Sequence, residues 1–131
     1  DQKWNYTWYD GNPATNGGGV GYSSGTCKTA GRCDTEKYVA DVNAASLCGY
    51  TDWRMPKANE LQSIVDYSRA YPTATVDSTY LPNTRAYNFW SASAYAGDSG
   101  YAWRVYFGYG NVSRSDGKGV AFPVRLVRAG Q

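Results

Sequence analysis

The chain has 131 residues, a length that fits one domain with a modest core. A formal net charge of +2, carried by scattered basic residues, argues against nucleic-acid binding, and no stretch approaches the roughly 20 apolar residues of a membrane span. Tyrosine (13 residues) and glycine (15) are abundant, which is typical of antibody-like binding surfaces. It is equally typical of a β-rich fold with glycine turns and tyrosine-bearing strands, and composition leaves both interpretations open.

The first third of the chain predicts a short strand, a long loop and a helix. Residues 3–9 alternate aromatic and polar side chains, as a strand does. Residues 10–33 are rich in Gly, Asn, Ser and Thr, which indicates a loop. Asp34 suits the N-cap of a helix over residues 35–47, and Gly49 suits the left-handed residue that follows a helix.

Three cysteines cannot all pair within one chain. Cys27 and Cys33 flank a short loop and are placed to form a small ring, whereas a straight helix between Cys33 and Cys48 would hold their ends about 20 Å apart. We therefore expect a Cys27–Cys33 disulfide, a buried free thiol at Cys48, and an oxidising compartment. The absence of histidine disfavours a zinc site.

The rest of the chain predicts a second helix and then antiparallel strands. An apolar stripe favours a helix over residues 58–67, and proline-containing residues 68–88 are irregular. Two helices followed by a small antiparallel sheet, joined by long irregular loops, make an α+β fold. The expected strands cover residues 89–93, 101–107 and 123–128, with a hairpin turn at residues 108–111.

The strand with the clearest alternation separates a supporting side from an exposed side. Trp103, Val105 and Phe107 face one way and are expected in the core. Arg104 and Tyr106 face the other way, toward solvent. Trp53 and Trp90 are also expected in the core, whereas Arg125 and Arg128 are expected to face outward on the last strand.

Several segments together resemble the C-terminal domain family of the Legionella collagen-like adhesin, over most of the chain from about residue 4 to residue 128. They are LCGYTDWRMP (residues 47–56), EL (60–61), FWSAS (89–93), AWRVYF (102–107) and VRLVR (124–128). The resemblance implies a C-type-lectin-like fold and a single ligand-binding domain over residues 1–131, the C-terminal part of a longer surface protein. Some relatives bind sulfated glycans such as glycosaminoglycans, and others are variable proteins of diversity-generating retroelements.

The residue types of the C-terminal third fit the pattern that a diversity-generating retroelement produces. In those systems mutagenesis of adenines in AAY codons gives Tyr, Ser, Gly, Asp, Arg and others, but not Lys, Glu, Gln, Met or Trp. Between about residue 91 and residue 122, only Trp103 and Lys118 lie outside the accessible set. Any exposed surface rich in Tyr, Ser and Gly would pass the same filter.

We therefore expect a non-catalytic, extracellular or cell-surface domain whose variable surface binds a protein. The alternative is a constant adhesin for sulfated glycans, with a homotrimer concentrating Arg104, Arg114 and Arg125. The expected ligand-binding residues are Tyr95, Asp98, Tyr101, Arg104, Tyr106, Tyr109, Ser113, Arg114, Asp116 and Phe122.

Catalysis and bound metals are not expected. Without histidine the chain lacks the commonest general base and the Ser-His and Cys-His nucleophile pairs. Calcium needs clustered oxygen ligands, and the spacing of Asp98, Asn111 and Asp116 forms no ligand pattern. We expect no cofactor and no required metal.

Overall fold

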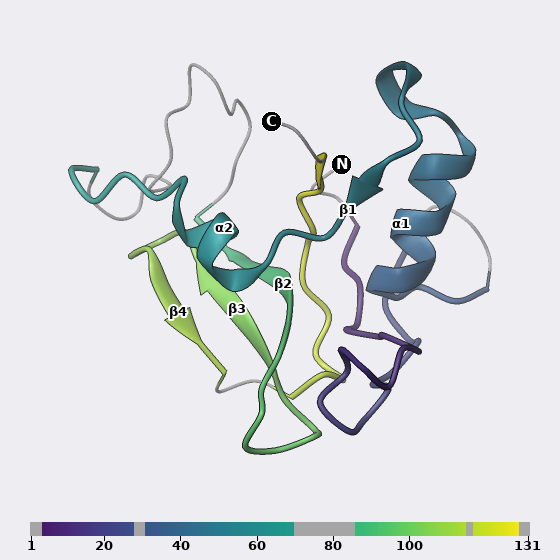
Figure 1. The fold of residues 1–131 in the computed structure, drawn as a ribbon. Coiled ribbons are helices and arrows are strands. Elements are labelled where there is room, and N and C mark those ends of the chain that lie inside the picture. Colours follow the sequence, from purple (N-terminus) through teal and green to yellow (C-terminus); the bar gives the residue numbers. More distant parts are fainter. Residues whose placement is uncertain (1–3, 28–30, 70–85, 115–116, 129–131) are drawn as a thin grey trace.

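The computed structural model describes residues 4–27, 31–69, 86–114 and 117–128, which form an α+β fold with long loops, as predicted (Figure 1). A three-stranded antiparallel sheet has the order β2-β3-β4, and a two-stranded antiparallel sheet pairs β1 with β5. The elements are α1 (Thr35–Ala44), the 3₁₀ turn η1 (Leu47–Gly49), β1 (Trp53–Arg54), α2 (Ala58–Gln62), β2 (Asn88–Ala94), β3 (Ala102–Tyr106), β4 (Asn111–Ser113) and β5 (Val127–Arg128).

The three-stranded sheet has a core on each side. Successive side chains of a strand point to opposite sides, so neighbouring residues of β2 enter different cores. On the side of α2, a cluster that we call the α2-side core contains Leu61, Phe89, Val105 and Phe107. On the other side, a cluster that we call the opposite core contains Trp8, Trp90, Ala102 and Phe122.

The N-terminal segment covers the opposite side without forming a regular strand, so the prediction of a strand over residues 3–9 is wrong in detail. Tyr6 exchanges backbone hydrogen bonds with Phe122, and Trp8 N–H donates to the carbonyl of Lys118 at 3.0 Å. Thr7, between them, instead forms an isolated parallel β-bridge with Asp34. Because partners come from several segments, no continuous ladder forms. Figure 1 shows this purple segment beside the yellow C-terminal one.

Both helices begin as predicted but end early. Asp34 caps α1 by accepting from the backbone N–H of Lys37 at 2.9 Å. The helix ends at Ala44 because Ser46 takes a left-handed backbone, with φ 50°. In α2, the hydroxyl of Ser63 donates to the carbonyl of Glu60 at 2.5 Å, and turns replace the predicted helix beyond it.

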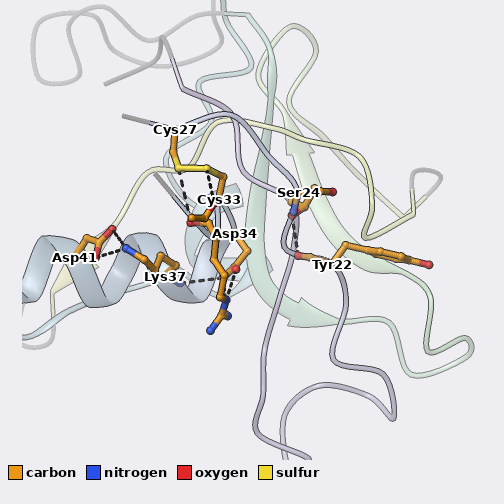
Figure 2. The surroundings of a disulfide bond; sticks show 10 residues. Tyr22, Ser24, Cys27, Cys33, Asp34, Lys37 and Asp41 are labelled. Carbon is orange, nitrogen blue, oxygen red and sulfur yellow. Dashed lines mark hydrogen bonds and ion pairs between the residues drawn. A yellow bond between two sulfur atoms is a disulfide. The ribbon is translucent and has the colours of Figure 1, made fainter. Parts of the chain in front are cut away.

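The predicted disulfide is present and the predicted burial of the third cysteine is wrong. Cys27 and Cys33 are bonded, with 5.4 Å between their Cα atoms. Figure 2 shows this bond beside the first turn of α1, where Asp34 follows Cys33 directly. Cys48 is free and exposed, because the turn η1 carries it away from the helix. The disulfide therefore fixes the start of α1 to the preceding loop.

The last predicted strand is mostly irregular, and its arginines do not simply face outward. Only the last two described residues pair with β1. Arg128 donates to the carboxylate of Asp52 at 2.7 Å, and its Cζ lies 3.3 Å from the ring centroid of Tyr50. Arg125 is partly buried, which lowers its pKa. Both side chains are partly enclosed at this end of the chain.

Candidate ligand-binding surface

One group of predicted site residues lies on the sheet side opposite α2. Cross-strand partners share a side of the sheet, so the register defines which side chains belong together. We call this surface the sheet face. It contains two rows of cross-strand partners. In one row, Arg104 and Ser113 lie next to the buried Trp90, and the other row contains Asn88, Tyr106 and Asn111. Tyr109, in the turn after β3, completes the sheet face.

Contacts between neighbouring side chains hold the sheet face in place. The guanidinium of Arg104 donates to Oδ1 of Asn88, across the strands β2 and β3. The rings of Tyr106 and Tyr109 meet edge to face, with centroids 5.8 Å apart. A Cβ at Gly108 would lie 2.5 Å from the ring of Tyr106, so this turn needs glycine for the ring to occupy its position. Tyr109 itself is 63% exposed.

Phe122 is not part of the exposed surface, and the prediction that placed it there is wrong. It is 5% exposed because its backbone pairs with Tyr6, which directs the ring into the opposite core. Its centroid lies 4.9 Å from that of Trp90 and 5.9 Å from Cζ of Arg104. Phe122 therefore supports the sheet face from below.

Tyr87 is a surface residue that the sequence interpretation missed. It is 40% exposed and its ring centroid lies 6.3 Å from that of Phe122, beside Asn88 of the sheet face. The predicted strand began at Phe89, one residue later than the observed strand begins. Tyrosine directly before the strand was the available signal.

A second group lies on the α2 side of the sheet, so the predicted residues do not form one surface. Trp103 shares its side of β3 with the buried Val105, and its ring meets that of Tyr95 edge to face at 5.4 Å. Cζ of Arg114 lies 4.4 Å from the Tyr95 centroid. We call Tyr95, Trp103 and Arg114 the aromatic stack. Trp103 is only partly buried, and with Asn59 of α2 it lines a shallow depression of about 370 Å³.

The remaining predicted residues belong to the turn between β2 and β3. The carboxylate of Asp98 accepts from the backbone N–H of Gly100 at 2.9 Å, and its carbonyl accepts from Tyr101 N–H at 3.2 Å. The carbonyl of Tyr101 in turn accepts from the N–H of Tyr95. These contacts shape the turn. Asp116 lies outside the described residues.

The two residues that adenine mutagenesis cannot produce occupy supporting positions. Lys118 is 1% exposed, and the sequence interpretation assigned it no role. Trp103 carries the aromatic stack on one side of β3. Its burial is only partial, so the expectation of a core position holds in part.

The three arginines of the glycan alternative lie apart from one another in this chain. Arg104 and Arg114 come from opposite sides of the sheet by register, and Arg125 lies near Tyr38 of α1. Arg54 forms two hydrogen bonds with Glu60, at 2.8 and 2.7 Å, and together with the N–H of Lys57 these lower the pKa of Glu60 to about 2.

The described residues also include a cavity of about 390 Å³ between α1 and the segment around β1. Trp8, Val39 and Met55 form much of its wall, and Thr35 and Glu36 lie at its polar side. Their polar groups are used internally: the Thr35 hydroxyl donates to the carbonyl of Tyr9, and the Glu36 carboxylate accepts from Gly11 N–H. The cavity thus offers mainly apolar contact.

Within the described ranges, no three or more His, Cys, Asp or Glu residues come together in a way that could hold a metal ion. No helix in this part of the chain has the length and apolar character needed to cross a membrane.

Comparison with known proteins identifies one family. The family model described as the Lcl C-terminal domain matches residues 1–128, almost the whole chain. Neither the curated proteins nor the solved structures provide a match. The family match covers all the motif segments that carried the resemblance. The chain belongs to the Lcl C-terminal domain family.

Proposed function

We propose that this chain is an extracellular, non-catalytic binding domain that recognises a protein partner through the sheet face. Its family supports a ligand-binding domain of the adhesin type. The observation that carries the proposal is the arrangement of Arg104, Tyr106 and Tyr109, which present polar and aromatic atoms above a buried support. Tyrosine and arginine are the side chains most often found at energetic centres of protein interfaces.

The sheet face is also suited to sequence variation. Its side chains contact one another and lie outside the two buried clusters, so replacing them leaves both cores intact. Lys118, which the codon mechanism cannot generate, is buried and has a supporting role. We therefore propose that the chain is a diversified variable protein of a retroelement.

The disulfide supports the extracellular location, because such bonds persist mainly in oxidising compartments. Reduction of Cys27–Cys33 in the purified protein, followed by mass spectrometry, tests whether the bond forms. If Cys27 and Cys33 are alkylated before reduction, as the free Cys48 should be, the bond is absent and this location loses its support.

The alternative, a constant adhesin for sulfated glycans, receives less support from the charge distribution. Arg104 and Arg114 point to different sides of the sheet within one chain, so a trimer would have to bring separate arginines together. Such a surface would bind a heparin column in low salt and elute as salt screens the charges. If the unaltered protein is retained on the heparin column and the Arg104→Ser variant is not, the glycan is favoured over the protein partner.

The decisive experiment for diversification is to sequence the DNA around the gene and related copies of the domain. We expect a nearby reverse transcriptase and a template repeat that differs from the gene at adenines, in the codons of the sheet face. The codons of Val105 and Phe107 should be unchanged, because both side chains are buried. Absence of a template repeat, or changes spread equally over buried and exposed codons, would refute diversification.

A further inference from the structure

Lys118 is a buried cation held by backbone carbonyls. It is 1% exposed, and its Nζ donates to the carbonyls of Asn16 at 2.9 Å, Gly19 at 2.7 Å and Ser99 at 2.7 Å. The same Nζ lies 4.3 Å from the ring centroid of Trp8. No carboxylate of a described residue lies within ion-pair distance of this Nζ, so carbonyl dipoles and an aromatic ring surround the charge.

The number of donors matches the number of acceptors. A lysine ammonium carries three N–H donors, and three carbonyls accept from this one. A neutral amine has only two N–H donors and could not donate to all three carbonyls. Burial lowers the pKa of Lys118, and the carboxylates of Asp10 and Asp98 act against that lowering. The geometry therefore corresponds to the charged form.

The three carbonyls come from loops that are distant in sequence. Asn16 and Gly19 belong to the glycine-rich loop after the N-terminal segment, and Ser99 belongs to the turn between β2 and β3. These loops approach closely: a Cβ on Gly19 would lie 2.6 Å from the carbonyl oxygen of Ser99. Converging carbonyl oxygens and the face of an aromatic ring both attract a cation.

We propose that these three carbonyls and the Trp8 ring form an internal cation site, occupied here by the chain's own Lys118 ammonium. When the lysine side chain is removed, the site accepts a free primary alkylammonium ion. This inference goes beyond the proposed binding function and does not rest on it. Within the segment proposed to vary, Lys118 would be a constant positioning residue for the Asp98–Tyr101 turn.

The test is chemical rescue of Lys118→Ala, which deletes the ammonium and its stem. The variant should unfold about 10 °C below the unaltered protein, because three carbonyls lose the ammonium that donates to them. Propylammonium chloride, which matches the deleted atoms, should raise its Tm in a saturable way, since a ligand that binds only the folded state stabilises it. Tetramethylammonium chloride at equal concentration has no N–H donor and should not.

The matched control is Lys57→Ala, which removes an exposed lysine. Its Tm should respond equally little to both salts, as should that of the unaltered protein. Equal responses of Lys118→Ala to propylammonium and tetramethylammonium would overturn the proposal.

A measurement on the unaltered protein covers the case in which Lys118→Ala fails to fold. With ¹⁵N-labelled lysine, the Lys118 ammonium should give an Nζ–H signal whose protons exchange slowly with water, whereas the exposed Lys57 should give none. Lys118→Met, which fills the stem volume without a donor, should lack that signal. Absence of any protected ammonium signal in the unaltered protein would overturn the proposal independently of partner binding.

Discussion

The two sides of the β2–β4 sheet are built differently. On the α2 side, Leu61, Phe89, Val105 and Phe107 pack into a continuous apolar cluster. On the other side, Trp8 and Phe122 cover only the end that holds Trp90 and Ala102, and the rest carries the sheet face. One strand, β3, therefore contributes to two cores and still presents partly exposed side chains to solvent.

The two sides of the sheet should differ most in the free energy of unfolding that is lost when an aromatic side chain is replaced by alanine. Phe107→Ala should lower the free energy of unfolding by about 3–5 kcal/mol, because it opens a cavity in the α2-side core. Urea unfolding followed by tryptophan fluorescence measures the loss. The control is Tyr109→Ala, which removes a similar ring from an exposed turn. Equal losses for the two variants would contradict the assignment of core and surface.

The N-terminal segment, which contains Tyr6, should stabilise the fold less at alkaline pH. Burial raises the pKa of Tyr6 to about 12, with smaller contributions from Tyr38 and Asp41. The contribution of the neutral Tyr6 hydroxyl to stability is therefore complete below the pKa of tyrosine in the unfolded chain, about 10. It is lost as the pH rises toward about 12, the pKa of Tyr6 in the folded protein. We expect the loss attributable to Tyr6 to be on the order of 2 kcal/mol, measured by urea unfolding across this range.

Tyr6→Phe isolates that contribution, since it keeps the ring and removes the ionisable hydroxyl. Its stability should fall less steeply between about pH 10 and about pH 12 than that of the unaltered protein. Identical slopes for the two proteins would show that Tyr6 is not the group responsible.

The sequence predicts best those features that depend on near neighbours. The N-cap at Asp34 and the Cys27–Cys33 bond were recognisable because the residues involved lie close together in the chain. The alternation of β3 similarly identified Val105 and Phe107 as core residues. Periodicity along the chain likewise predicted the order of the two helices and the strands that follow them.

The sequence does not predict which side of the molecule a loop residue reaches. Phe122 is buried because it pairs with Tyr6, a contact between opposite ends of the chain. The prediction treated Tyr95 and Arg104 as one surface, but they lie on different sides of the sheet, and the register between β2 and β3 shifts between Trp90 and Ala94. Such long-range pairing and irregular register leave no local pattern.

A smaller effect is expected where the core supports the sheet face. Phe122→Leu should cost about 1–2 kcal/mol, since most apolar volume is retained, yet it removes the ring below Arg104. We expect partner binding to weaken more than stability alone accounts for, because Arg104 loses its support. Binding measured by calorimetry at a temperature where both proteins are folded separates the two effects. Unchanged affinity would show that Phe122 acts only in the core.

The smallest effect on stability, and the largest contrast with partner binding, is expected at the exposed tyrosine of the sheet face. Tyr109→Ala should change the free energy of unfolding by no more than about 0.5 kcal/mol, because a side chain that is 63% exposed loses little buried area. Truncation of a central interface tyrosine typically costs about 2 kcal/mol of binding energy, a roughly thirtyfold weaker Kd. Tyr22→Ala is the matched control, since Tyr22 is 58% exposed and does not belong to the sheet face. If both variants bind the partner equally well, the partner does not use this face.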